Sequence, residues 1–217
     1  ASRTTLSDRE YLTGSWEGER DYLIGNGIRI NSTLIGDLFA NMGGGIEQET
    51  VFLDNWELAL SMNLQPLLGW KGAHVNGSLL QNNGQLLTSS VGDLQTANNI
   101  EAVQTIRIYE LWIEQVLFKN KLSILGGVYD INSEFDYIDS ATLFINSSQG
   151  MGAALATSGL VGPPTFPATG LATRVKVKPA PQFYIQAAAT DAIPGLYHVD
   201  WRLNNKGFFY IAEIGLL

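Results

Sequence analysis

The chain has 217 residues and a formal net charge of −8, from 21 acidic and 13 basic side chains, and it contains no cysteine. The acidic balance argues against a nucleic-acid partner, whose binding requires neutralised phosphates, and the missing cysteines exclude disulfides and thiolate metal sites. Only 16% of the residues are charged, against about 25% in typical soluble domains, and no apolar run approaches the roughly 18 residues expected of a membrane-spanning helix.

Residues 1–27 are predicted to form a polar segment followed by a short amphipathic helix over 15–26. Ser15 is a suitable N-cap, and Gly27 is a suitable stop. Trp16, Arg20 and Leu23 recur at the three- and four-residue spacing of one helix face. The simplest interpretation is a helix packed against the end of a sheet.

From Ile28 onward the apolar pattern changes to a period of two, which is typical of β-strands. The pattern predicts eight strands, over 28–42, 51–64, 72–81, 105–117, 122–131, 172–178, 182–190 and 208–217. A further short pairing segment is predicted at Val199–Leu203, with a turn at 204–207. We therefore predict that 28–217 forms a single, all-β, antiparallel domain.

The strand Thr105–Leu117 alternates most cleanly. One face carries Tyr109, Leu111 and Ile113, and the other carries Glu110, Trp112 and Glu114. A soluble sheet turns its apolar face inward, whereas a membrane barrel turns it toward lipid and lines its lumen with the polar face. Arg107 shares the alternation of Tyr109, so it is predicted to face lipid unless the strand contains a bulge.

The connections between strands favour the membrane barrel. Short connections at 119–121, 179–181 and 204–207 are interspersed with long ones at 82–104 and 132–171. Outer-membrane barrels have short periplasmic turns and longer extracellular loops, and strands of about 10 residues cross the bilayer. Aromatic residues that recur near strand ends are candidates for the interfacial girdles: Trp56, Trp70, Tyr109, Phe118, Phe208 and Tyr210.

Four stretches, in the same order and spacing, are shared with a known family. The first, Leu12-Thr13-Gly14-Ser15-Trp16-Glu17-Gly18-Glu19-Arg20, is similar to an N-terminal Leu-Thr-Gly-Asp-Trp-Gly-Gly-x-Arg signature, with Ser15 and Glu17 replacing Asp and Gly. The others lie at 92–115, 130–147 and 211–215. Over nearly its whole length the chain resembles the OprB family of carbohydrate-selective outer-membrane porins.

The resemblance implies a sixteen-stranded barrel in the bacterial outer membrane with a polar pore for small sugars, of which this chain covers about the N-terminal half. An open half sheet is not viable in lipid, because its edges leave backbone groups unpaired. Three arrangements remain: the chain is part of a longer porin, another copy closes its barrel, or eight strands close by themselves. The first is preferred.

A sugar channel requires weak, exchangeable contacts from donors, acceptors and aromatic faces. The candidates for the pore lining are Glu57, His74, Asn76, Arg107, Glu110, Trp112, Glu114, Glu134 and Arg174, with Glu213, Lys176 and Lys178 as further polar residues. The segment containing Asp130 and Glu134–Tyr137 is predicted to fold into the pore as a constriction. For each residue the simpler interpretation is a solvated wall position without a selective role.

Nothing in the sequence favours an enzyme. The two histidines, His74 and His198, lack a metal-ligand spacing, and the chain contains no nucleophile elbow or P-loop. Glu110 and Glu114 on one strand lie about 13 Å apart, too far for a glycosidase pair. We expect no metal or cofactor, and as partners sugars, outer-membrane lipid and the remainder or other copies of the barrel. The alternatives are a non-conducting structural or adhesive barrel and, less favoured, a soluble β-barrel binding protein.

Overall fold

The computed structural model of the protein describes residues 9–202 and 207–216. Eight strands form one antiparallel sheet in which each strand pairs with its neighbours in sequence. The strands are β1 (Ile28–Ala40), β2 (Thr50–Asn63), β3 (Ala73–Gly84), β4 (Thr105–Leu117), β5 (Leu122–Tyr129), β6 (Gly170–Ala180), β7 (Phe183–Asp191) and β8 (Phe208–Leu216). All eight predicted strands and the antiparallel all-β class are confirmed, although β3 continues three residues beyond its predicted end, from Gln81 to Gly84.

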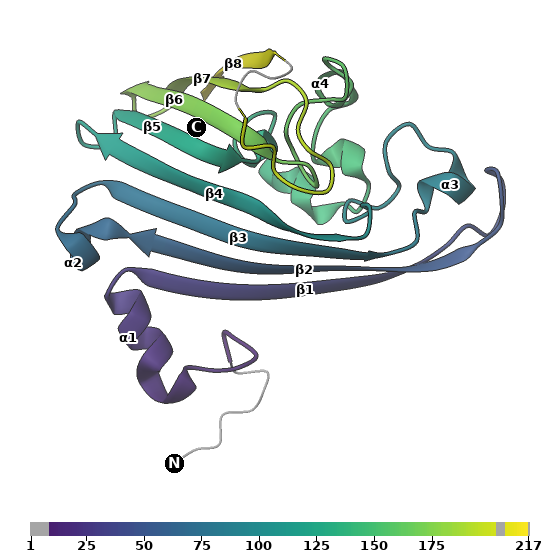
Figure 1. Ribbon diagram of the computed structural model, residues 1–217, viewed down its shortest axis with the longest axis horizontal. Coiled ribbons are helices and arrows are strands. Elements are labelled where there is room, and N and C mark those ends of the chain that lie inside the picture. The colour runs from purple at the N-terminus through teal and green to yellow at the C-terminus, as the bar shows by residue number, and fades with distance from the viewer. Residues whose placement is uncertain (1–8, 203–206, 217) are drawn as a thin grey trace.

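The two ends of the sheet differ (Figure 1). Connections 64–72, 118–121 and 181–182 lie at one end, which we call the short-turn end. Connections 41–49, 85–104, 130–169 and 192–207 lie at the other, the long-loop end. The predicted pairing at Val199–Leu203 is wrong for its described part, because 199–202 is irregular and belongs to the long 192–207 connection; residues 203–206 lie outside the described residues.

The two faces of the sheet have opposite chemistry. On the outer face, Leu34 and Leu38 of β1 are 72% and 73% exposed, and large apolar side chains are similarly exposed along the other strands. On the inner face, Arg174 of β6 and Gln186 of β7 are each only 1% exposed. A soluble protein would show the reverse, so this distribution is that of a wall between lipid and a polar lumen.

β4 contains a bulge that corrects one prediction. Ser78 of β3 pairs with Glu110, but the next residue, Leu79, pairs with Ile108, so Tyr109 has no opposite residue. A bulge reverses the facing of every side chain beyond it. Tyr109 and Arg107 therefore face inward, and the predicted lipid-facing position of Tyr109, together with its role in an aromatic girdle, is wrong.

The helices are short and lie outside the strands, either before β1 or in the connections. A 3₁₀ turn, η2 (Trp16–Gly18), leads into α1 (Glu19–Gly25), so the predicted helix is present but shorter. The others are α2 (Leu64–Leu68), α3 (Thr88–Val91), α4 (Ala153–Ala156) and the 3₁₀ turns η3 (Ile131–Ser133), η4 (Asp139–Leu143) and η5 (Ser147–Gln149). α1 lies at the short-turn end, beside the start of β1 (Figure 1).

None of the helices in residues 9–202 or 207–216 is both long and apolar enough to cross a membrane.

The long connections are hydrogen-bonded to one another. The Ile46 amide in 41–49 donates to the Ser90 carbonyl in 85–104 at 2.8 Å. The Asn99 amide donates to the Ile145 carbonyl in 130–169 at 2.7 Å, and Ser147 donates back to the Thr96 carbonyl at 3.1 Å. These contacts join three of the four connections of the long-loop end.

The far edges of β1 and β8 have no strand partner within the described residues, since the sheet order begins with β1 and ends with β8. The arrangement in which the eight strands close by themselves is therefore wrong. In a bilayer these edges require further strands, because unpaired backbone groups are costly in hydrocarbon.

At Gly127 of β5, the backbones of β4 and β5 approach so closely that there is no space for a side chain. Its φ is +141°, and a Cβ atom there would lie 2.2 Å from the Leu111 carbonyl oxygen and 2.6 Å from the Trp112 Cα. Gly127→Val should lower the free energy of unfolding by roughly 1–3 kcal/mol or more. The loss would be seen as a weaker heat-modifiable folded band in electrophoresis. Gly126→Val is the matched control, because a Cβ at Gly126 meets nothing within 4 Å; equal effects of the two substitutions would contradict this reading.

Candidate functional site

The 130–169 connection lies against the inner face of the sheet (Figure 1). Ile131 and Phe135 are fully buried, and they pack with Leu125 and Tyr129 of β5 and Ala188 of β7. This apolar cluster holds the start of the connection inside the curve of the sheet rather than above it. The segment predicted as a constriction therefore lies along the inner wall.

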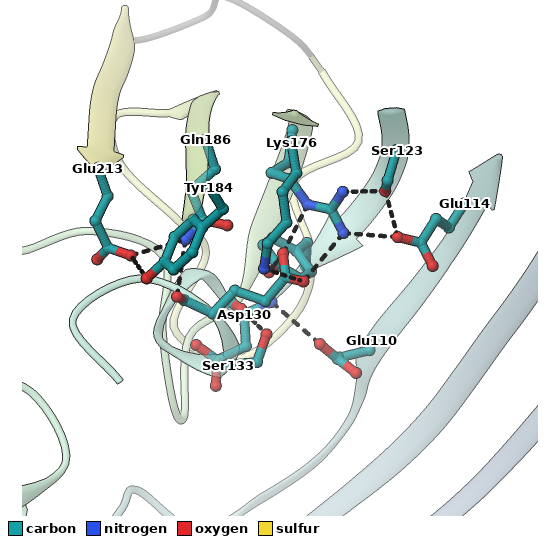
Figure 2. A network of polar contacts seen from close by, with 12 residues as sticks. Glu110, Glu114, Ser123, Asp130, Ser133, Lys176, Tyr184, Gln186 and Glu213 are labelled. Carbon is teal, nitrogen blue, oxygen red and sulfur yellow. Dashed lines mark hydrogen bonds and ion pairs between the residues drawn. The ribbon is translucent and has the colours of Figure 1, made fainter. Parts of the chain in front are cut away.

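A polar network lies beside that cluster and includes Glu114, Ser123 and Lys176 (Figure 2). Arg174 is at its centre. Its guanidinium forms ion pairs with Glu114 of β4 at 2.9 Å and with Glu134 of the connection at 2.6 Å, and it also donates to the Ser123 hydroxyl. Lys176 lies 3.6 Å from Glu134. Arg174 is only 1% exposed, so loss of both carboxylates would leave an uncompensated buried charge, whereas loss of one would leave the guanidinium with a single partner.

Glu213 of β8 extends this network across the wall. Its carboxylate accepts hydrogen bonds from Tyr184 at 2.6 Å, from Gln186 at 3.1 Å and from the Asp136 backbone amide at 2.8 Å. Gln186 also donates to the Glu134 carbonyl at 2.9 Å. β7 and the 130–169 connection are thus both fixed to one carboxylate of β8.

A second group of contacts lies on β3 and β4. Asn76 donates to Glu110 at 3.0 Å, and Glu110 also accepts from the Asp130 backbone amide at 3.3 Å. Asp130, the first residue after β5, accepts from the Tyr109 hydroxyl and from the Asn132 amide. Burial raises the pKa of the Asp130 carboxyl above its ordinary value, although these hydrogen bonds act in the opposite direction.

Arg107 binds the connections of the long-loop end. Its guanidinium donates to the carbonyls of Gly195 at 2.8 Å and Leu196 at 2.9 Å in 192–207, and to the Thr169 carbonyl at 3.2 Å in 130–169. It is 3% exposed. Arg107 is therefore a structural link between two connections and is covered by them.

The nine residues proposed from the sequence fall into distinct places. Glu114, Glu134 and Arg174 are in direct contact, and Asn76 and Glu110 form a separate pair. His74 and Trp112 border a cavity near the short-turn end together with Glu114. Glu57 lies on the inner face of β2 opposite Leu80, and Arg107 is buried at the other end of the wall.

Sequence reasoning missed three members of the network. Tyr184 and Gln186 alternate inward on β7, and Ser123 does so on β5. They carry no charge, so a search for charged residues on the polar face gave no reason to select them. Pairing each strand with its neighbour would have found Ser123, which lies directly opposite Lys176.

Known proteins share this architecture. The family model of the carbohydrate-selective porins, OprB family, matches residues 48–216. The chain belongs to the OprB family. It is 27% identical over 207 residues to Porin B of Pseudomonas aeruginosa, an alignment that covers 89% of this chain. The family is one of outer-membrane channels rather than enzymes, which locates this chain in the outer membrane of a Gram-negative bacterium.

Two solved structures of Pseudomonas putida OprB have the same fold. The high-pH structure aligns with a TM-score of 0.75 at 24% identity over 86% of this chain, and the low-pH structure with a TM-score of 0.56 at 19% identity over 83%. This chain spans 44% of Porin B and 46% and 50% of the two OprB chains. The eight strands therefore correspond to about half of these OprB proteins.

Arg107→Met tests the link between the connections. Loss of the guanidinium leaves buried carbonyls without donors, at a cost of about 1–3 kcal/mol each. We expect faster limited proteolysis within 130–169 and 192–202 and a lower unfolding temperature. Arg202→Met is the control, because Arg202 is 74% exposed and forms a surface ion pair with Asp200; equal protease sensitivity of both variants would contradict the role of Arg107.

The raised pKa of the Asp130 carboxyl should make the stability of the protein depend on pH. Since its pKa is raised on folding, the folded protein binds more protons between the unfolded value, about 4, and the folded value. The stability contributed by this group is present below about pH 4 and is lost as the pH rises through the folded pKa. Asp130→Asn removes the titration, so the unfolding temperature of the wild type should fall relative to that of the variant as the pH rises above about 4. Parallel curves, or an equal effect of Asp139→Asn at an exposed position, would refute this.

Proposed function

We propose that this chain forms part of the wall and the constriction of an outer-membrane channel for passive, carbohydrate-selective diffusion of small sugars. One observation carries the proposal: the inner face is lined by fixed polar and charged groups, while the outer face exposes large apolar side chains. Membership of a family of carbohydrate-selective porins supports it. The short-turn end faces the periplasm and the long-loop end the exterior, as in other outer-membrane barrels.

Selectivity in this proposal comes from size and from fixed polar groups. The 130–169 connection occupies space inside the curve of β4–β8, and the Arg174 network keeps it there. Glu134 is paired with Arg174 and Lys176, and the carboxylates of Asp130 and Asp136 accept hydrogen bonds from the protein, so the wall offers fixed hydrogen-bonding groups. Neutral, hydroxyl-rich solutes exchange water for such groups at little cost and can leave again.

The domain division and the completion of the barrel are part of the same proposal. Residues 28–217 contribute barrel strands, and residues 1–27, with α1 at the short-turn end, form a periplasmic segment. The free edges of β1 and β8 pair with the strands that complete the barrel, supplied by further sequence of a longer porin or by other copies. The nine residues Glu57, His74, Asn76, Arg107, Glu110, Trp112, Glu114, Glu134 and Arg174 belong to the inner wall, Arg107 by holding its connections.

Reconstitution tests the channel directly. The purified protein should form channels of stable conductance in planar bilayers, and liposomes containing it should swell faster in monosaccharide than in tetrasaccharide solutions. Protein denatured before reconstitution is the control. Absence of both conductance and swelling would favour a non-conducting structural barrel instead.

A further inference from the structure

The outer face of the wall has an apolar recess of about 380 Å³ over β1–β4. It lies at Gly77 of β3, which has no side chain where the neighbouring strands place Leu60 and Leu111 directly opposite. Large apolar side chains border the recess: Ile30, Leu58, Leu60, Leu79, Ile108 and Leu111. A missing side chain thus leaves a hollow in a face that is otherwise covered by large apolar groups.

Two polar residues, Ser78 and Glu110, also border the recess, but their side chains belong to the inner face. They lie opposite each other in the β3–β4 ladder, one position from Gly77. Glu110 accepts hydrogen bonds on the inner face, from Asn76 and from the Asp130 amide. The recess therefore presents hydrocarbon to its surroundings, and in the outer membrane these surroundings are lipid acyl chains.

The recess lies within the depth of one leaflet from the short-turn end. Along β3, Gly77 is four residues from Ala73, the first residue of the strand, which corresponds to about 13 Å. One leaflet contributes about 15 Å of hydrocarbon, half of the bilayer core. Val75 and Ile113, paired on the outer face, continue the apolar surface from the recess toward that end. An acyl chain in the recess therefore has its headgroup at the short-turn end.

Trp70 and Lys71 are held at that end on the outer face. The Trp70 indole N–H donates to the Gln115 side-chain oxygen at 2.7 Å, and the Gln115 amide donates to the Lys71 carbonyl at 3.0 Å. Gln115 alternates with Leu111 and Ile113 along β4, so these contacts are on the lipid side of the wall. The backbone of Lys71, whose side chain is exposed, is thus fixed beside an indole at the level of the headgroups.

The connections of the short-turn end carry lysines and no carboxylate. Connections 64–72, 118–121 and 181–182 contain Lys71, Lys119 and Lys121, and neither Asp nor Glu. All three lysines are exposed, and none belongs to an ion pair of the described residues. The Val116 amide donates to the Gly72 carbonyl at 2.7 Å, so the first two connections are adjacent. Lys178 lies beside Lys121, to whose carbonyl its amide donates at 2.8 Å.

The other charges near this end lie elsewhere on the wall. The acidic residues Glu17, Glu19 and Asp21 are in η2 and α1, which lie beside β1 rather than beside β3–β5. On the inner face, Arg29 borders a cavity with His74, and Glu114 is paired with Arg174. The lipid side of β3–β5 at the short-turn end is therefore basic.

From the recess and these lysines we infer a binding site for one anionic phospholipid, with an acyl chain in the recess and the headgroup at Lys71 and Lys119. A lysine near a membrane surface strengthens the binding of anionic lipid about fivefold. The site goes beyond the sugar channel and does not depend on it. It rests on the location in the outer membrane and on the orientation with the short-turn end in the periplasmic leaflet, which consists of phospholipids.

Native mass spectrometry of the purified, detergent-solubilised protein tests the headgroup part of the site. The wild type should bind one phosphatidylglycerol more tightly than the zwitterionic phosphatidylethanolamine. Lys71→Gln should weaken phosphatidylglycerol binding about fivefold and leave phosphatidylethanolamine within about twofold. Arg29→Gln is the matched control, because it removes the same charge at the same end but on the inner face. Equal affinity of the wild type for the two lipids, or equal effects of both substitutions, overturns the site.

Gly77→Leu tests the acyl-chain part by filling the recess. A Cβ at Gly77 would lie 3.5 Å from the Leu111 Cδ1, an ordinary contact, so the variant should keep its heat-modifiable folded band. It should weaken the binding of both lipids about tenfold, because the chain loses its packing surface. Gly126→Leu is the control, since Gly126 lies opposite Ile113 on the outer face and a Cβ there meets nothing within 4 Å.

Unchanged lipid affinity in Gly77→Leu overturns the site. If that variant instead alters the oligomeric state, the recess is an interface between copies of the chain. Channel conductance should be the same in the wild type, Lys71→Gln and Gly77→Leu, because both residues lie away from the lumen. A wild type that binds the lipid but does not conduct overturns the channel alone, and one that conducts without selecting phosphatidylglycerol overturns the lipid site alone.

Discussion

The extra residue in β4 determines how the inner wall divides into two regions. On one side of the bulge, Arg107 and Tyr109 face inward and hold the long connections through backbone carbonyls and through Asp130. On the other side, Trp112 and Glu114 face inward toward the short-turn end. A regular strand would have to turn one of these sets toward lipid, and a guanidinium in hydrocarbon is costly. The bulge lets a single strand serve both regions while Ile106, Ile108, Leu111 and Ile113 all remain outside.

Polar groups on this wall serve two different purposes. Those around Arg174 and Glu213 are bound to one another, and their function is to fix a connection against the wall. For His74 and Asn31, no side-chain hydrogen bond is found among the described residues, so their hydrogen-bonding capacity is not used within the wall. A channel requires both, because a constriction must be rigid to discriminate by size, whereas a transit site must release what it binds. Proximity to the lumen therefore does not by itself identify a solute contact, and internal partners must be counted first.

The strands and their facing were largely predictable because a period of two is a local property of the sequence. The position of all eight strands followed from it, as did the inward facing of Glu110, Glu114 and Arg174. The facing of Tyr109 was not predictable, because a bulge depends on the register with β3 and leaves no clear local signal in β4. Tyr184 and Gln186 were missed for a related reason: neutral side chains acquire their role only from what packs opposite them. The irregular Val199–Arg202 segment was misassigned because short apolar runs do not distinguish a strand from a packed connection.

Three connections of the long-loop end are bonded to one another through backbone atoms, from 41–49 to 85–104 and on to 130–169. Surface loops of barrels usually accept insertions and deletions independently, because each touches little but solvent. Here a change of length in one connection would displace the hydrogen-bonding partners of the next. Related proteins should therefore vary the lengths of these connections together or preserve all of them, and a substitution in one should be compensated in its neighbour. Backbone hydrogen bonds thus couple the geometry of these three connections to one another.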